Sequence, residues 1–167
     1  GEGSMSKLKD KVAIVTGGAS GIGEAIVRVF GAEGAQVISA DVADVAGQQI
    51  VDEVCAADGD AVFTHADVSH VCDIQALIAD TLERFGRLDV FVANAGIQIE
   101  KTLTETTEDE FDRLMSVNQR GAFFCCKHAV EAMLENGEAG GSIVVMGSAL
   151  SHVAEPELAA YCTAKGG

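Results

Sequence analysis

Short apolar runs alternate with amphipathic segments along this chain. The apolar runs are rich in β-branched residues and close on small or polar ones, as buried strands do. They predict five strands, at residues 11–18, 35–41, 60–68, 88–96 and 141–149. The segments between the first four repeat apolar side chains every three or four positions, which predicts helices at 22–30, 44–57 and 74–85. Strands that alternate with helices predict an α/β fold, a parallel sheet covered on both faces.

Three more helices are expected in the second half of the chain. Thr107 and Glu110 have the spacing of a capping box, which predicts a helix start within the polar stretch 100–118. Residues 121–135 are apolar nearly all round and predict a deeply packed helix. For their run "AFFCC", an interface shared between subunits explains the pattern equally well. A last helix should begin near Leu158.

Composition and charge narrow the class of protein. The 167 residues are 48% hydrophobic, enough for one domain with a core. A formal net charge of −15 argues against nucleic acid as a partner. The sequence shows no secretory signal and no apolar run of about 18 residues, so we expect no membrane association. The first four residues, "GEGS", precede Met5 and are typical of an expression-tag remnant, so the domain is expected at 5–167.

Cysteine and histidine usage predicts a cytoplasmic protein without a metal site. The five cysteines include no C-x-x-C pair, which argues against a disulfide framework or a zinc site and favours a reducing cytoplasm. The four histidines (His65, His70, His128 and His152) are not spaced as metal ligands.

The first predicted strand runs into "TGGASGIG" (16–23), a glycine-rich turn before a helix. Gly17, Gly21 and Gly23 let the backbone approach a phosphate, and the helix N-terminus supplies N–H groups and positive potential. A nucleoside-triphosphate loop would carry lysine after the last glycine, but Glu24 stands there. The turn indicates a dinucleotide site, with a plain strand-to-helix turn as the alternative.

Asp41 ends the second predicted strand, 18 residues after Gly23. A carboxylate there can accept hydrogen bonds from an adenosine ribose and would repel the 2′-phosphate of NADP. The next residues, Val42 to Asp44, include no arginine to hold that phosphate. We therefore expect NAD rather than NADP. A helix-capping role for Asp41 is the alternative.

Tyr161, the only tyrosine, and Lys165 are one helical turn apart and should share a helix face. An ammonium close to a phenol stabilises the phenolate. Tyr161 could then take a proton from an alcohol or give one to a carbonyl. Ser148 lies at the carboxyl end of the fifth predicted strand and could hydrogen-bond the same oxygen. Because ligands of parallel sheets lie beyond the carboxyl ends of the strands, these groups point to one edge.

The ordered set of motifs resembles the classical branch of the short-chain dehydrogenase/reductase family. The matching segments are "TGGASGIG" (16–23), Asp41, "ADV" (66–68), "NAG" (94–96), Asn118 in "SVN", Ser148 and "YCTAK" (161–165). The resemblance covers residues 7–167. It implies a Rossmann-type, doubly wound parallel sheet in three α/β/α layers.

The resemblance also implies roles for individual residues. The implied catalytic residues are Asn118, Ser148, Tyr161 and Lys165, with Asn118 positioning a water. Those implied to bind the cofactor are Gly17, Ser20, Gly21, Ile22, Gly23, Asp41, Asp67, Val68, Asn94, Ala95 and Gly96, together with Tyr161 and Lys165. The implied partners are a small alcohol or carbonyl substrate and further copies of the chain, as a dimer or tetramer.

Members of this family normally continue past the Tyr-Lys helix with further strands and a segment that closes over substrate. The 167 residues contain no such segment, so we expect a domain that is truncated or incompletely observed at its C-terminus. The fifth strand should then form a sheet edge.

Three functional hypotheses follow from the sequence. The first is an NAD-dependent oxidoreductase that interconverts a secondary alcohol and a ketone. Within the same class, a 3-oxoacyl-thioester reductase is the alternative, although such enzymes usually prefer NADPH and Asp41 argues against that. The third hypothesis is a non-catalytic dinucleotide-binding fragment.

Overall fold

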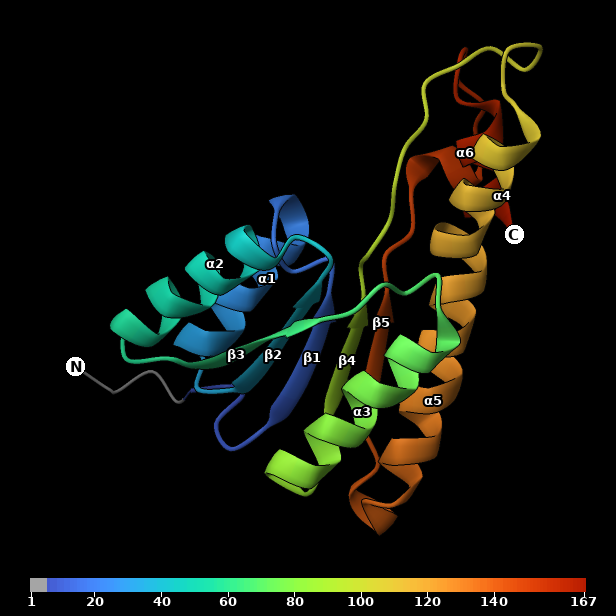
Figure 1. The fold of residues 1–167 in the computed structure, drawn as a ribbon. Helices are drawn as coiled ribbons and strands as arrows, with labels where there is room; N and C mark the ends of the chain where they lie inside the picture. Colours follow the sequence, from blue (N-terminus) through green and yellow to red (C-terminus); the bar gives the residue numbers. More distant parts are fainter. Residues whose placement is uncertain (1–5) are drawn as a thin grey trace.

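The computed structural model describes residues 6–167, which form a five-stranded parallel sheet with helices on both faces (Figure 1). The strands are β1 (Val12–Thr16), β2 (Gln36–Asp41), β3 (Asp60–His65), β4 (Val90–Ala93) and β5 (Ser142–Val145). They lie in the order β3-β2-β1-β4-β5, so the chain winds outward on one side of β1 and then on the other. This arrangement confirms the predicted doubly wound sheet. The expected tag remnant at residues 1–4 lies outside the described residues.

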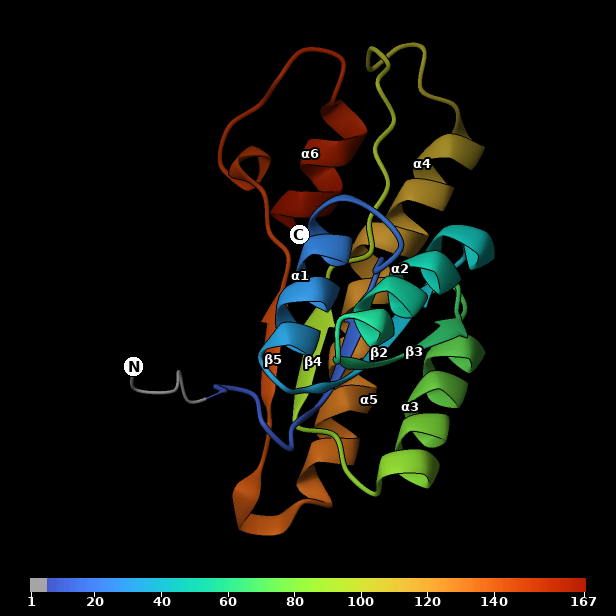
Figure 2. The same cartoon turned by 90° about the vertical axis from the view of Figure 1, so that its left-hand side faces the viewer.

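The helices divide between the two faces of the sheet (Figures 1 and 2). Helices α1 (Gly21–Ala32) and α2 (Asp44–Ala56) cover one face, and α3 (Val71–Phe85) and α5 (Ala122–Leu134) cover the other. Alternate residues of a strand point to opposite faces. Val15 of β1 accordingly packs with the α1 and α2 side chains, whereas its neighbour Ile14 packs with those of α3 and α5.

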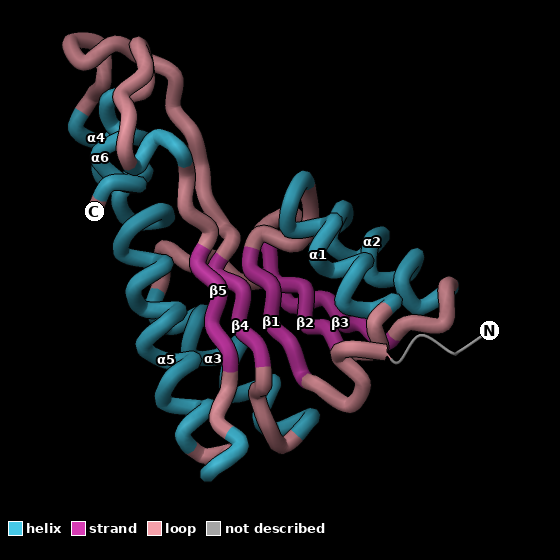
Figure 3. The backbone as a smooth tube through the Cα atoms, turned by 180° about the vertical axis from the view of Figure 1, so that it is seen from behind, coloured by secondary structure: helices cyan, strands magenta, loops and turns pink. Residues whose placement is uncertain are grey.

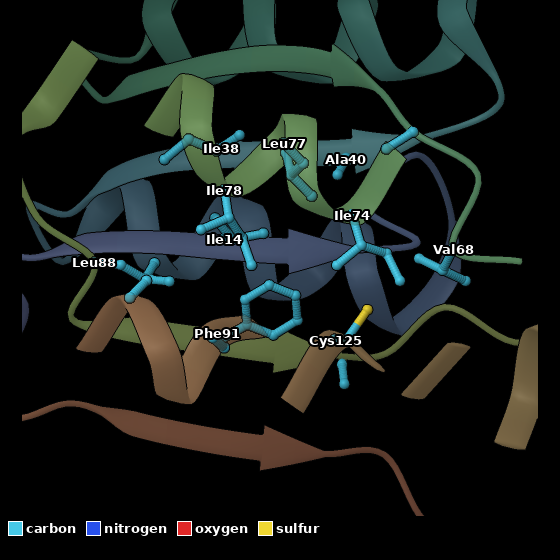
Figure 4. Close-up of a cluster of buried hydrophobic side chains, with 14 of the residues drawn as sticks. Ile14, Ile38, Ala40, Val68, Ile74, Leu77, Ile78, Leu88, Phe91 and Cys125 are labelled. Carbon is cyan, nitrogen blue, oxygen red and sulfur yellow. The ribbon is translucent and has the colours of Figure 1, made fainter. Parts of the chain in front are cut away.

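The core beneath α3 and α5 is built around Phe91 of β4 (Figure 4). Its ring is fully buried and lies among Ile14, Leu88 and Cys125. Burial of a ring of this size stabilises the fold by roughly 2–3 kcal/mol. Burial also raises the pKa of the Cys125 thiol to about 12, so this cysteine fills space in the core and is not a nucleophile.

Helix α4 (Glu108–Met115) continues into α5 through a π-helical segment, Ser116–Gly121, that periodicity did not predict. The predicted capping box is present at its start. The backbone N–H of Glu110 donates to the Thr107 hydroxyl at 3.3 Å, and the Thr107 N–H donates to the Glu110 carboxylate at 3.0 Å. These two bonds fix the first residue of the helix.

The prediction of a deeply packed helix over 121–135 is wrong for one face of α5. Cys125 and Ala129 are buried against the sheet, but Phe123 is 67% exposed and Leu134 is 73% exposed. The helix meets the sheet on one side only, so its apolar residues on the other side face outward.

Beyond the carboxyl ends of β4 and β5, residues 97–115 and 147–166 form a second tier above the sheet (Figure 3). The loops after these strands rise together and carry α4 and α6 (Ala159–Gly166), with a short 3₁₀ turn at Ala149–Ser151. The N–H of Lys101 donates to the carbonyl oxygen of Glu157 at 2.7 Å and joins the two loops. Helix α6 starts where expected and is thereby held over the edge of the sheet.

The predicted strands are correct in number, but all of them except β2 were predicted too long at their carboxyl ends. β1 ends at Thr16 and β4 at Ala93, whereas the apolar runs suggested 18 and 96. The extra residues leave the sheet in turns. β5 is an edge strand, as predicted, and its Val144 and Val145 are about half exposed. A second 3₁₀ turn, Gly137–Ala139, precedes it.

Candidate functional site

A cleft of about 720 Å³ lies at the carboxyl edge of the sheet, below the second tier. It gathers residues that are far apart in the sequence. The predicted site residues that line it are Gly17, Ser20, Gly21, Ile22, Asp41, Asp67, Val68, Asn94, Ala95, Gly96, Ser148, Tyr161 and Lys165. Two predicted residues, Gly23 and Asn118, do not line the cleft and lie behind its wall. One cavity therefore unites the glycine-rich turn with the tyrosine–lysine pair.

The glycine-rich turn is packed so closely that side chains are excluded. A Cβ atom at Gly23 would lie 1.9 Å from the carbonyl oxygen of Gly17, and Gly17 itself has a φ of +68°. The Asn94 side-chain nitrogen donates to the carbonyl oxygens of Thr16 at 3.0 Å and Gly17 at 3.3 Å. Asn94 thus fastens the turn to the end of β4, so its amide is occupied by the protein's own backbone.

The N-terminus of α1 follows this turn and is open to a ligand. Ser20 is the N-cap residue, but its side chain accepts no hydrogen bond from the first turn. The first N–H groups of a helix have no partner within the helix. A free helix N-terminus beside a turn of glycines fits the phosphates of a dinucleotide.

Asp41 lies at the end of β2 and borders the cleft. One carboxylate oxygen accepts from the N–H of Ala19 and the other from the N–H of Ala43, both at 3.0 Å. Ala43 is itself the N-cap of α2, so Asp41 does not cap that helix's first turn. The alternative role as a helix cap is therefore wrong. Its carboxylate is instead held in one orientation at the cleft.

Asp67 occupies the equivalent place after β3. Its carboxylate accepts from the N–H of Ser69 at 2.9 Å and lies 3.5 Å from a ring nitrogen of His70. Burial raises the pKa of the Asp67 carboxyl, but the hydrogen bonds from Ser69 and the charge of His70 outweigh it and leave the pKa below its ordinary value. Asp67 therefore presents an anionic acceptor to the cleft at neutral pH.

Tyr161 and Lys165 of α6 line the same cleft, as does Ser148 from the segment after β5. The Lys165 ammonium donates to the carbonyl oxygen of Met146 at 2.8 Å and lies 5.9 Å from the centre of the Tyr161 ring. Burial lowers the pKa of Lys165. The Ser148 hydroxyl accepts from the N–H of Leu150 at 3.1 Å, which leaves its hydrogen free to donate to a ligand.

Asn118 lies in the π-helical segment and is only 5% exposed. Its amide nitrogen donates to the carbonyl oxygen of Ile97, and its amide oxygen accepts from the N–H of Ile97, both at 2.8 Å. The side chain therefore joins the segment after β4 to the π-helical segment.

Several residues of the cleft were missed by sequence reasoning. Arg113 and Val117 line it from α4 and the π-helical segment, and Met146 lines it from the end of β5. Thr16, whose hydroxyl accepts from the N–H groups of Asn94 and Ala95, supports it from below. Their positions depend on tertiary packing, which periodicity does not report.

Metal-ligand clusters and helices able to span a membrane are absent from residues 6–167. These residues bring together no group of three or more histidine, cysteine or acidic side chains that could hold a metal ion. Within the same range, no helix is both long and apolar enough to cross a membrane.

The fold and the cleft together define a dinucleotide-binding α/β protein. Residues 11–167 match the family model described as short chain dehydrogenase. The chain belongs to this family of oxidoreductases.

Individual relatives agree with this assignment. The chain is 41% identical over 162 residues to 2,5-dichloro-2,5-cyclohexadiene-1,4-diol dehydrogenase of Sphingobium indicum, covering 96% of this chain and 63% of that protein. It is 37% identical over 158 residues to an uncharacterized oxidoreductase of Thermotoga maritima, covering 95% of this chain and 61% of that protein. The chain thus spans less than two thirds of the length of these curated relatives.

A solved structure gives the same fold. The crystal structure of a short-chain dehydrogenase/reductase from Burkholderia phymatum in complex with NAD superposes with a TM-score of 0.92 at 28% identity. The match covers 96% of this chain and 57% of that one.

Proposed function

We propose that the protein transfers hydride between NAD(H) and a secondary alcohol or ketone. The observation that carries the proposal is the single cleft that joins the glycine-rich turn and Asp41 to Ser148, Tyr161 and Lys165. A dinucleotide laid along this cleft has acceptors and donors for its ribose and phosphates at one end and a proton donor at the other.

The cofactor preference rests on Asp41. Its carboxylate stays at the end of β2 because the N–H groups of Ala19 and Ala43 hold it there. It can accept from both ribose hydroxyls, whereas a 2′-phosphate would meet a fixed negative charge. The NAD complex of the Burkholderia relative supports the same choice.

When bound, the nicotinamide supplies the hydride acceptor or donor. The chain's own residues accept or donate the proton of the substrate oxygen. In alcohol oxidation, Tyr161 accepts the hydroxyl proton of the substrate while Ser148 donates a hydrogen bond to the same oxygen. The Lys165 ammonium lies 5.9 Å from the centre of the Tyr161 ring. In carbonyl reduction the proton moves from Tyr161 to the substrate oxygen.

Asn118 takes a positioning role in this proposal. Its amide is paired with the backbone of Ile97, which also lines the cleft. Its side chain therefore supports the cleft wall, and the water-positioning role that the resemblance implies stays a prediction.

The test is the Tyr161→Phe variant, which removes one oxygen and keeps the ring. We expect turnover with a panel of secondary alcohols to fall by at least about 10²-fold, while the Kd for NADH changes less than about threefold. The matched control is Thr163→Val, two residues along α6, whose hydroxyl only donates back to Ala159. Unchanged turnover in Tyr161→Phe would overturn the proposed proton transfer.

A further inference from the structure

Arg113 is a positively charged residue in an acidic chain, and its side chain pairs with no other in the described part of the chain. The chain has 26 aspartate and glutamate residues but only 11 lysine and arginine residues. Every other arginine of residues 6–167 has a partner: Arg28 pairs with Glu24 and Glu53, Arg84 with Asp80, Arg87 with Asp89, and Arg120 with the carbonyl oxygen of Ser69. Within the same described range, the Arg113 guanidinium forms no ion pair and no hydrogen bond. It lines the cleft instead.

The position of Arg113 on α4 indicates which end of the cleft its side chain covers. Val117, one turn further on, packs against the core cluster that contains Val68. Arg120, three residues further on in the π-helical segment, donates to the carbonyl oxygen of Ser69 at 3.0 Å. This side of the helix therefore faces the connection between β3 and α3. Arg113 extends the same side outward, above the part of the cleft that Asp67, Val68 and Ser69 line.

A different face of α4 meets the tyrosine helix. Leu114 is fully buried and packs with Ala160 and Ala164 of α6. Successive residues of a helix are rotated by about 100°. Arg113 therefore does not face α6 and lies on the side of α4 that borders the cleft.

The chemistry of this end of the cleft selects the partner. Asp41 and Asp67, its acidic groups, already accept hydrogen bonds from backbone N–H groups, and neither forms an ion pair with Arg113. A planar, weakly hydrated guanidinium stacks well on the face of an aromatic ring. Val117 and Val68 add apolar surface beside it. Such a pocket fits a purine base.

We propose that Arg113 binds the adenine ring of the dinucleotide by stacking its guanidinium on the face of the base. The inference rests on the dinucleotide-binding part of the proposed function. It adds a cofactor-binding residue that lies across the cleft from the glycine-rich turn and Asp41.

The experiment measures dissociation constants by isothermal titration calorimetry for NAD, AMP and inorganic pyrophosphate. The variants are Arg113→Met, which keeps the length of the side chain, and Arg113→Lys, which keeps the charge and loses the plane. Arg84→Met is the matched control, because Arg84 is half exposed on α3 and lies outside the cleft. Thermal melting of each variant checks that the fold is retained.

We expect Arg113→Met to weaken NAD and AMP by about the same factor, about tenfold, and to leave pyrophosphate unchanged. Arg113→Lys should recover only part of the loss, and Arg84→Met should bind like the parent. Unchanged NAD and AMP binding in Arg113→Met would overturn the inference and leave the proposed function standing.

Two further outcomes are informative in different ways. In the first, Arg113→Met also weakens pyrophosphate binding, Arg113→Lys restores binding in full, and the loss disappears in 0.5 M salt, where the Debye length is about 4 Å. This result would indicate a contact with phosphate in place of stacking and would overturn the inference. If the parent protein binds neither NAD nor AMP, the cofactor part of the proposed function fails first, and the inference fails with it.

Discussion

Replacement of Gly23 by alanine adds one methyl group at the tightest point of the glycine-rich turn. The new Cβ would lie 1.9 Å from the carbonyl oxygen of Gly17 and 2.6 Å from the side-chain nitrogen of Asn94. Both contacts are far inside van der Waals distance, and one partner is backbone. The start of α1 must therefore move away from the end of β4.

The size of the effect follows from two opposing terms. Overpacking of a close-packed site typically costs 1–3 kcal/mol, and a backbone contact this short places Gly23 near the upper value, about 3 kcal/mol. Alanine is favoured over glycine within a helix by about 1 kcal/mol. The net loss is about 2 kcal/mol, which lowers the Tm of a domain of this size by about 4–8 °C. NAD affinity should fall at least about tenfold, because the displaced N–H groups no longer converge on the phosphates.

Calorimetric melting and NADH titration of Gly23→Ala test these values. Gly147→Ala is the matched control for stability, because a Cβ there meets nothing within 4 Å. It should melt within about 2 °C of the parent. A Gly23→Ala variant that melts like Gly147→Ala and binds NADH normally would refute the argument that this turn is closed by its glycines.

Two further variants test contacts on either side of the sheet, one beside the cleft and one at the amino ends of β1 and β4. Asn118→Ala should cost about 2 kcal/mol in urea denaturation, because it leaves the N–H and carbonyl of Ile97 unpaired; an unchanged midpoint would contradict this role. Asp89→Asn removes a buried carboxylate that accepts from the N–H of Val12 and from Arg87. Burial raises the pKa of Asp89, but the hydrogen bonds from Val12 and Arg87 outweigh this effect and leave the pKa below its ordinary value. The ionised carboxylate therefore stabilises the fold above about pH 4, and this stabilisation is lost as the pH falls through the lowered pKa. The variant should therefore lose less stability than the parent between about pH 5 and 3, and parallel pH profiles would contradict the argument.

The number of strands could be predicted because each is a short apolar run between helical repeats, and the doubly wound arrangement followed from the family resemblance. Their ends could not. The apolar or small residues of "ADV" and "NAG" continue the strand pattern, yet in the structure they turn away from the sheet and line the cleft. The exposure of Phe123 was missed for a related reason. Periodicity marks a helix but cannot report how much of its circumference another element covers.

Most residues of the candidate site could be predicted because they lie in motifs that follow one another in the order seen in the family that the chain resembles. Thirteen of the fifteen predicted residues line one cleft, all except Gly23 and Asn118. What the motifs did not convey is how each side chain is used. The amides of Asn94 and Asn118 bind the protein's own backbone, and Arg113 reaches the cleft from a helix of which the sequence predicted only the start.

The measurement that tests the central claim most directly is a fluorescence titration of the protein with NADH and, separately, NADPH. The fixed carboxylate of Asp41 predicts saturable binding of NADH, with NADPH weaker by at least about tenfold, equivalent to about 1.4 kcal/mol. Binding of neither nucleotide would contradict the assignment of the cleft, and tighter binding of NADPH would contradict the role given to Asp41.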